Sequence, residues 1–216
     1  MKGFDISIPI TNGMVTWPGD PPVKLSHISE IKKGDESNIS YLEMCVHTGT
    51  HIDAPRHFID GGKTIESILM EKLIGKVLVV DVNADVDVIT EKVLLSHPKI
   101  DDIKKSKKIL FHTRNSSFWT SRSDTFYRNY VGIDASGAKY LTALGMDLVG
   151  VDYLSVAPFT DTLEPHQIFL SNEVVLLEGI NLTNIEEGFY QLYCLPLNIP
   201  DCDGAPARAI LMPLNR

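Results

Sequence analysis

The stretch "GKVLVVDV" at residues 75–82 decides the fold of this chain. It is an apolar run of strand length, rich in β-branched residues, and this pattern predicts a buried strand. Three later runs share its length and composition and predict further buried strands: "KILFHT" at 108–113, "DLVGVD" at 147–152 and "EVVLLEGINL" at 173–182.

Segments with helical spacing separate these runs. They are "TEKVLLSH" at 90–97, "DASGAKYLTAL" at 134–144 and "EPHQIFLSN" at 164–172. Thr90 and Asp134 stand at the first residues of two of them, where an oxygen-bearing side chain can cap a helix. Alternating strands and helices are typical of an α/β domain with a largely buried sheet.

The N-terminal third has a different pattern. Three strand-like segments, at 4–10, 23–31 and 38–47, follow one another with no helix between them. They predict an antiparallel or mixed layer beside the α/β part. A length of 216 residues, 44% of them hydrophobic, fits one domain spanning 1–216, and no linker interrupts it.

Composition excludes several classes of protein. A net charge of −8 argues against a nucleic-acid partner, which would require a basic surface. The first ten residues, "MKGFDISIPI", resemble neither a signal peptide nor a membrane anchor. The odd number of cysteines, without any C-x-x-C spacing, indicates reduced thiols and a cytoplasmic protein: Cys45, Cys194 and Cys202.

The segment "CVHTGTHIDAPRHF" at 45–58 concentrates titratable side chains. It places three of the seven histidines of the chain, with one aspartate, within eleven residues. Imidazole is the commonest metal ligand in proteins, and histidine with carboxylate suits zinc, manganese and similar divalent ions. The candidate ligands are His47, His51, Asp53 and His57.

The backbone of this segment must bend for its side chains to converge. A straight strand would separate the Cα atoms of His47 and His51 by roughly 13 Å, the far limit for two imidazoles on one ion. Gly49, between them, can adopt backbone angles that other residues avoid. Pro55 prevents a helix and carries His57 to a separate position, so we predict a kinked strand end or loop.

Glu178 interrupts the apolar run at 173–182 and is the one acidic side chain expected to be buried there. A buried carboxylate must be paired, hydrogen-bonded or metal-bound. A salt bridge to arginine or lysine is one possibility. His166 supports the other, because it opens the helical segment that leads into this run and can reach the same sheet edge. With the first cluster, these residues form a set large enough for two ions.

These motifs resemble a known family. "HTGTHIDAPRHF" at 47–58 closely resembles the H-x-G-T-H-x-D-x-P-x-H-F signature of the cyclase-like metal-dependent hydrolases, whose best-known members are the bacterial kynurenine formamidases (arylformamidases). The opening segment with its Trp-Pro-Gly-Asp loop at 17–20, "VGID" at 131–134, and His166 followed by Glu178 in "LLEGINL" are also similar to this family.

The resemblance implies a swivelling β/β/α domain with a mixed sheet and flanking helices, assembled as a homodimer or higher homo-oligomer. It also implies two divalent ions per chain, Zn²⁺ or Mn²⁺. Trp17 matches a substrate-contact position of the family, although a tryptophan before Pro-Gly can equally anchor a loop. The implied metal ligands are His47, His51 and Asp53 for one ion and His166 for the second, with Asp53 and Glu178 bridging both, while His57 becomes the proton donor and acceptor.

The activity implied is metal-dependent hydrolysis of an aryl formamide such as N-formylkynurenine. One alternative is ring opening of a cyclic amide or lactone, as in the isatin hydrolases of the same family. Another is a metal-binding protein without turnover, against which His57 argues because ion binding alone would not need it. The loops at 111–119 and 196–206 are candidates to line the substrate pocket.

Overall fold

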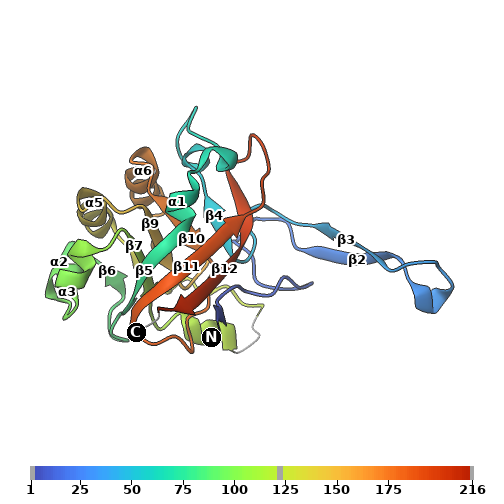
Figure 1. The fold of residues 1–216 in the computed structure, drawn as a ribbon, viewed down its shortest axis with the longest axis horizontal. Coiled ribbons are helices and arrows are strands. Elements are labelled where there is room, and N and C mark those ends of the chain that lie inside the picture. The colour runs from blue at the N-terminus through green and yellow to red at the C-terminus, as the bar shows by residue number, and fades with distance from the viewer. Residues whose placement is uncertain (1–2, 121–123, 215–216) are drawn as a thin grey trace.

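The fold is a closed mixed β-sheet with helices packed against its outer face, in a computed structural model that describes residues 3–120 and 124–214 (Figure 1). Seven strands form the ring in the order β12-β11-β5-β7-β9-β10-β4, and β4 pairs again with β12 to close it. Strands β5, β7, β9 and β10 are parallel, and the other pairings of the ring are antiparallel. The predicted mixed sheet with flanking helices is confirmed.

The ring strands are β4 (His51–Asp53), β5 (Ile74–Asp81), β7 (Lys108–His112), β9 (Leu148–Val151), β10 (Val175–Glu178), β11 (Gly188–Pro196) and β12 (Gly204–Pro213). The other strands are β1 (Phe4–Asp5), β2 (Lys24–Ser29), β3 (Ile39–Glu43), β6 (Val88–Ile89) and β8 (Gly132–Ile133). The α-helices are α1 (Met70–Leu73), α2 (Glu91–Ser96), α3 (Ile100–Lys105), α4 (Ser116–Thr120), α5 (Ala135–Ala143) and α6 (Leu163–Ser171), and the 3₁₀ turns are η1 (Ile31–Lys33), η2 (Pro55–His57) and η3 (Ile65–Ser67).

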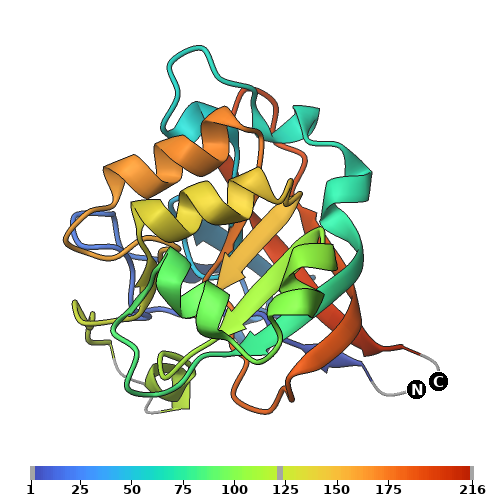
Figure 2. The same ribbon diagram turned by 90° about the vertical axis from the view of Figure 1, so that its left-hand side faces the viewer.

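Residues 77–80 of β5, its unbroken apolar run, are buried on both faces, as predicted. Val77 and Val79 point into the core enclosed by the ring, whereas Leu78 and Val80 join a second core beneath the helices. Figure 2 shows helices α2, α3, α5 and α6 together on that outer side of the sheet. The two cores explain why the central residues of the parallel strands, 77–80, 109–111, 148–151 and 175–177, carry no polar side chain.

The predicted N-cap residues Thr90 and Asp134 do cap the first turns of helices α2 and α5. The Thr90 side chain accepts a hydrogen bond from the Val93 amide at 3.2 Å, and Asp134 accepts one from the Gly137 amide at 2.8 Å. Each satisfies an amide that the first helical turn would otherwise leave unpaired. Among the described residues, no helix is long and apolar enough to span a membrane.

The predicted N-terminal layer is wrong in its placement. Only β1 of that region pairs with the main sheet, through β12. Strands β2 and β3 instead pair with each other and project from the body as a two-stranded arm, residues 24–43 (Figure 1). Every residue of β3 is exposed, so the arm does not cover the sheet.

The C-terminal region completes the ring. Strand β11 was not predicted, because its sequence "GFYQLYCLP" mixes aromatic and polar residues without a clear apolar run. It pairs with β5 on one side and β12 on the other. The C-terminal strand β12 pairs with β4 and thereby brings the histidine-rich segment into the sheet.

Candidate metal and active site

Strand β4 carries two of the candidate ligands, His51 and Asp53, on one face. His51 stands directly opposite Glu178 of β10, and Asp53 stands opposite Gly204 of β12. Cross-strand partners project from the same face of a sheet, as do residues two apart on one strand. The three side chains therefore converge, and each is at most 4% exposed.

Two glycines allow the bend before β4. Gly49 has φ +67° and Gly179 has φ +65°, conformations that favour glycine. A Cβ atom on Gly179 would lie 2.0 Å from the Gly49 carbonyl oxygen, so the two segments touch backbone to backbone. The predicted bend at Gly49 is confirmed, and it returns His47 to the site, with Nδ1 2.8 Å from Asp53 Oδ1.

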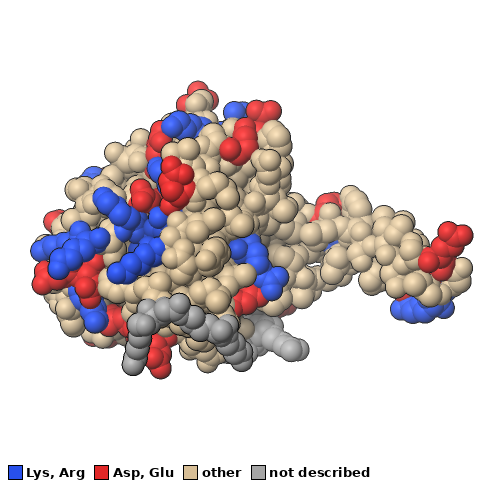
Figure 3. All heavy atoms as spheres, in the orientation of Figure 1, with Lys and Arg blue, Asp and Glu red and all other residues tan. Residues whose placement is uncertain are grey.

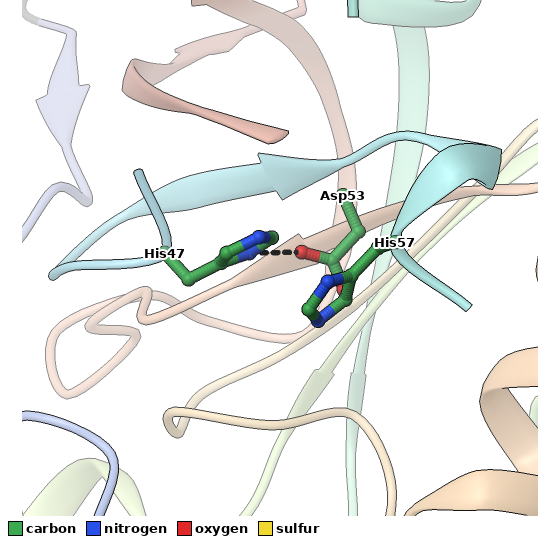
Figure 4. A group of neighbouring side chains, drawn as sticks. All are labelled: His47, Asp53 and His57. Carbon is green, nitrogen blue, oxygen red and sulfur yellow. Dashed lines mark hydrogen bonds and ion pairs between the residues drawn. The ribbon is translucent and has the colours of Figure 1, made fainter. Parts of the chain in front are cut away.

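His57 and His166 reach the site from two other elements. Turn η2 begins at Pro55 and carries His57, whose ring stacks on that of His47 with centroids 3.9 Å apart. His166 lies in the first half of α6, and its ring stacks on Phe58 at 4.3 Å. Figure 4 shows His47, Asp53 and His57 facing one another.

The imidazoles of the predicted ligands each have one ring nitrogen held by an oxygen acceptor. His51 Nδ1 lies 3.0 Å from the Gly49 carbonyl, and His166 Nδ1 lies 2.5 Å from the Thr162 carbonyl. His47 Nε2 lies 2.9 Å from Asp203 Oδ2. Metal-bound histidines commonly donate their second N–H in this way, which leaves the other nitrogen free to bind a cation.

The remaining nitrogens point at the two buried carboxylates. His51 Nε2 lies 3.4 Å from both Asp53 Oδ1 and Glu178 Oε2. His166 Nε2 lies 3.2 Å from Glu178 Oε1 and 3.8 Å from Asp53 Oδ2. Glu178 Oε1 also accepts a hydrogen bond from the Val156 amide at 2.7 Å.

The electrostatics of this cluster require positive charge. Burial lowers the pKa of His51, but its hydrogen bonds to Asp53 and Glu178 outweigh that effect and raise the pKa to about 10. Burial raises the pKa of Asp53, whereas the nearby His57 and His47 hold it well below its usual range. Within residues 3–120 and 124–214, no lysine or arginine pairs with either carboxylate, and the partners of Glu178 there are His51 and His166.

The donor set fits divalent cations. Ligand atoms of His51, Asp53 and Glu178 lie within 4.8 Å of one another, and so do those of His47, Asp53 and His57. Asp53 belongs to both groups, and its buried Oδ2 has no hydrogen-bond partner among the described residues. A buried carboxylate oxygen without a partner is costly, and a shared cation would satisfy it.

A cavity of about 200 Å³ opens beside this cluster. The predicted substrate contact Trp17 lines it and also packs against Phe126 and Phe159, with ring centroids 5.2 and 5.6 Å away. The loop at 111–119 does not contribute to the lining: Thr113 and Ser116 there bind the buried Asp152 instead. The lining consists of Trp17, Asp20, His47, His51, His57, Phe58, Leu154, Ser155, Thr162, His166 and Glu178.

Asp203 is the member of the site that sequence reasoning missed. Its Oδ2 lies 2.9 Å from His47 Nε2 and 3.3 Å from His57 Nδ1. It comes from the predicted 196–206 loop, where an acidic residue before a glycine is common in turns and indicates no partner. Phe58, which lines the cavity, was easier to identify from the sequence than Asp203, because it is the last residue of the histidine-rich signature.

Comparisons with known proteins agree with this geometry. Residues 4–158 match the family model described as putative cyclase. The chain is 37% identical to cyclase-like protein 3 of Oryza sativa subsp. japonica over 97% of this chain and 79% of the relative. It is 32% identical to a kynurenine formamidase of Bacillus cereus over 98% of this chain and 97% of that one.

Solved structures share the fold. One, described as a potential metal-dependent hydrolase with cyclase activity, superposes with a TM-score of 0.84 at 30% identity, covering 100% of this chain and 99% of its own. Isatin hydrolase A from Labrenzia aggregata gives a TM-score of 0.80 at 18% identity, covering 99% and 94% of the two chains. The second likeness extends to the fold alone.

Proposed function

The chain belongs to the cyclase family of hydrolases, and from that premise we propose that it is a metal-dependent arylformamidase that converts N-formylkynurenine to kynurenine and formate. One observation carries the proposal: Asp53 is shared by two groups of potential ligands, and His57, in one of these groups, has a ring nitrogen that makes no hydrogen bond to any described residue. We also propose that residues 1–216 act as one catalytic domain in the cytoplasm, where the three free cysteines would remain reduced.

The residues that would hold the metal are those of the sequence prediction: His47, His51, Asp53, His166 and Glu178. When bound, Zn²⁺ or Mn²⁺ would polarise the formyl carbonyl and make water a better nucleophile at neutral pH. His57 accepts a proton from the attacking water at Nε2, which makes no hydrogen bond to any described residue, and returns it to the leaving nitrogen. The water oxygen bonds to the formyl carbon as the C–N bond breaks, giving formate and the aryl amine.

Burial suits His57 to the role of base. Desolvation lowers the pKa of His57 below its usual value, and the nearby Asp53 offsets only part of this effect. The imidazole is therefore neutral at pH 7 and able to accept a proton. By contrast, the pKa of His166 is raised, because Glu178 and Asp53 outweigh its burial.

The cavity lining supports an aromatic substrate. Trp17 and Phe58 offer ring faces to it. Asp20, half-buried in the lining, would pair with the α-ammonium group of N-formylkynurenine. Ring opening of isatin or a lactone, the alternative within the family, would not need that pairing.

A substrate panel tests the proposal. The metal-loaded protein is assayed on N-formylkynurenine, formanilide, isatin and simple lactones, and the highest kcat/KM is expected for N-formylkynurenine. Asp20→Asn should raise KM for N-formylkynurenine about tenfold, the value of one charge-assisted hydrogen bond, and leave KM for formanilide unchanged because formanilide has no ammonium group. A higher kcat/KM for isatin would establish the ring-opening alternative. Inactivity on every substrate would favour a metal-binding protein without turnover.

We further propose that the protein is a homodimer joined through the β2–β3 arm. The arm exposes six large apolar side chains, each 39% to 66% exposed: Leu25, Ile28, Ile31, Ile39, Tyr41 and Leu42. Figure 3 shows few charged residues along the arm, with most of them gathered at its tip. An isolated two-stranded hairpin is only marginally stable in water, so the arm needs a covering surface.

A second copy of the chain fits this requirement. At the root of the arm, Leu42 and Met44 line an apolar groove of about 430 Å³ with Leu195 and Leu197 of the body. In a twofold dimer, the arm of each copy can lie in the groove of the other, so the same surface of both copies forms the interface. The arm alone has about as many residues as the roughly 20–30 that one partner contributes to a standard interface.

A further inference from the structure

The backbone around Asp203 is fixed against the site on two sides. Gly204, the next residue, pairs with Asp53, and a Cβ atom on it would lie 2.6 Å from His47 Cε1. The Asp203 carbonyl accepts a hydrogen bond from the Ala54 amide at 2.8 Å, immediately before the turn that carries His57. The Asp203 side chain is thus held beside both rings by close backbone contacts.

A single carboxylate oxygen then serves both imidazoles. Oδ2 of Asp203 lies 2.9 Å from His47 Nε2 and 3.3 Å from His57 Nδ1. The two rings are nearly parallel, with an interplanar angle of 25°. Because an ionised carboxylate only accepts hydrogen bonds, both nitrogens facing it must carry protons.

These protons decide what the opposite nitrogens can do. With Nε2 donating to Asp203, Nδ1 is the nitrogen of His47 that faces the ligand group; it lies 2.8 Å from Asp53 Oδ1, donates to it when no ion is present, and would give up that proton to bind a cation. A proton on His57 Nδ1 leaves a lone pair on Nε2. The first nitrogen can bind a cation and the second can accept a proton.

We propose that Asp203 is a positioning residue that sets the tautomers of His47 and His57 together, making the first a ligand and the second a base. This inference rests on the proposed hydrolase function for His57, but its effect on His47 is independent of any substrate. Losing such a supporting carboxylate typically costs about 10–100-fold in activity or metal affinity.

A double-mutant cycle on the metal-saturated protein tests the catalytic part. Asp203→Asn should lower kcat by about 10–100-fold with little change in KM, and Asp203→Glu should restore part of it. In a His57→Ala background, Asp203→Asn should cause no further loss of kcat, because the residue through which it acts is absent. The same fold-loss in both backgrounds, or wild-type kcat in Asp203→Asn, would overturn the proposal.

Two measurements that need no substrate separate failure of this inference from failure of the proposed function. Calorimetric titration of the metal-free protein with Zn²⁺ should show binding weakened about 10–100-fold in Asp203→Asn. ¹⁵N NMR of the neutral imidazoles in metal-free protein should show His57 protonated at Nδ1 in the wild type and a mixture of tautomers in Asp203→Ala. Unchanged affinity and unchanged tautomers would refute the positioning role even if the enzyme is active.

Asp201 provides the matched control. It lies two residues away in the same loop, its side chain is exposed, and its φ of +63° is tolerated by asparagine. Asp201→Asn should leave kcat, metal affinity and the His57 tautomer at their wild-type values. A matching loss in this variant would assign the effect to the stability of the loop and overturn the role of Asp203.

Discussion

The metal site and the β2–β3 arm depart from the usual distribution of polar and apolar groups in opposite directions. In the site, Asp53 is 1% exposed and Glu178 is 4% exposed, although carboxylates are normally at the surface. In the arm, Ile28 is 66% exposed and Ile31 58%, although such side chains are normally buried. The first arrangement requires a compensating charge, and the second requires a covering surface.

The two regions differ in how strongly the rest of the chain supports them. Strand β4 is paired on both sides and its carboxylates are surrounded by four imidazoles, so the site is positioned by the folded body. Among the described residues, the two strands of the arm pair only with each other, and Leu25 at their base is also hydrogen-bonded to the Asn12 side chain. We therefore expect substitutions in the site to act on cation binding and catalysis, and substitutions in the arm to act on assembly.

The largest expected effect comes from removing charge at the two buried carboxylates proposed as metal ligands, Asp53 and Glu178. Asp53→Asn should lower metal content from up to two ions per chain and reduce kcat by about 10⁴-fold or more, since the loss includes the step that His57 assists. Glu178→Gln should also lower the metal content. Elemental analysis of protein purified without chelators measures the content, with the exposed Glu164→Gln as control. Full metal content in Glu178→Gln would assign Glu178 to hydrogen bonding alone.

His57→Ala should separate catalysis from cation binding within the site. Loss of a positioned acid–base group costs about 10²–10⁴-fold in kcat, while metal content and fold should remain near normal. His51→Ala should instead lower metal occupancy, and added metal should restore part of the activity. Because His57 lies within ligand distance of His47 and Asp53, parallel loss of metal and activity in His57→Ala would reclassify it as a ligand.

A charge in the arm should break assembly without affecting the site. Leu42→Glu places a carboxylate in the proposed interface, and the lost apolar burial together with the added charge should weaken the dimer at least about 10²-fold. Sedimentation equilibrium should show dimers for the wild type and monomers for the variant. Leu95→Glu is the matched control, because Leu95 on α2 is 48% exposed, as Leu42 is. A monomeric wild type would remove the proposed role of the arm.

The smallest expected effect is on the pH dependence of kcat. Burial lowers the pKa of His57, so the base remains neutral until the pH falls below the usual histidine range. Activity should therefore be constant near pH 7 and fall on acidification, by up to about tenfold per pH unit. The limb at pH values below about 6.5 should disappear in His57→Ala after allowance for metal loss, and its persistence would point to protonation of the ligand histidines.

Prediction from sequence succeeded where neighbouring residues carry the information. The strands β5, β7 and β9 follow from apolar runs, and Thr90 and Asp134 form the predicted caps. His47, His51 and Asp53 were recognisable because they stand close together in the chain. Glu178 was recognisable as a carboxylate inside an apolar run and His166 as a histidine able to reach the same sheet edge, but which ion each would hold came only from the resemblance to a family.

Other features could not be predicted in this way. Asp203 meets its two histidines across 146 and 156 residues, and no spacing rule connects such positions. The strand character of β2 and β3 was predicted correctly, but their location away from the sheet was not. An alternating pattern specifies which side chains share a face, and not which surface that face meets.

The sequence by itself determined the apolar strands, the helix caps, the bend at Gly49 and the residues able to bind cations, because each depends on interactions within a few residues. Only the tertiary structure decided that the sheet closes through β4 and β12, that Glu178 stands opposite His51, and that Asp203 contacts both His47 and His57. These contacts join distant segments. They form only when packing of the two cores offsets the entropy lost in bringing those segments together.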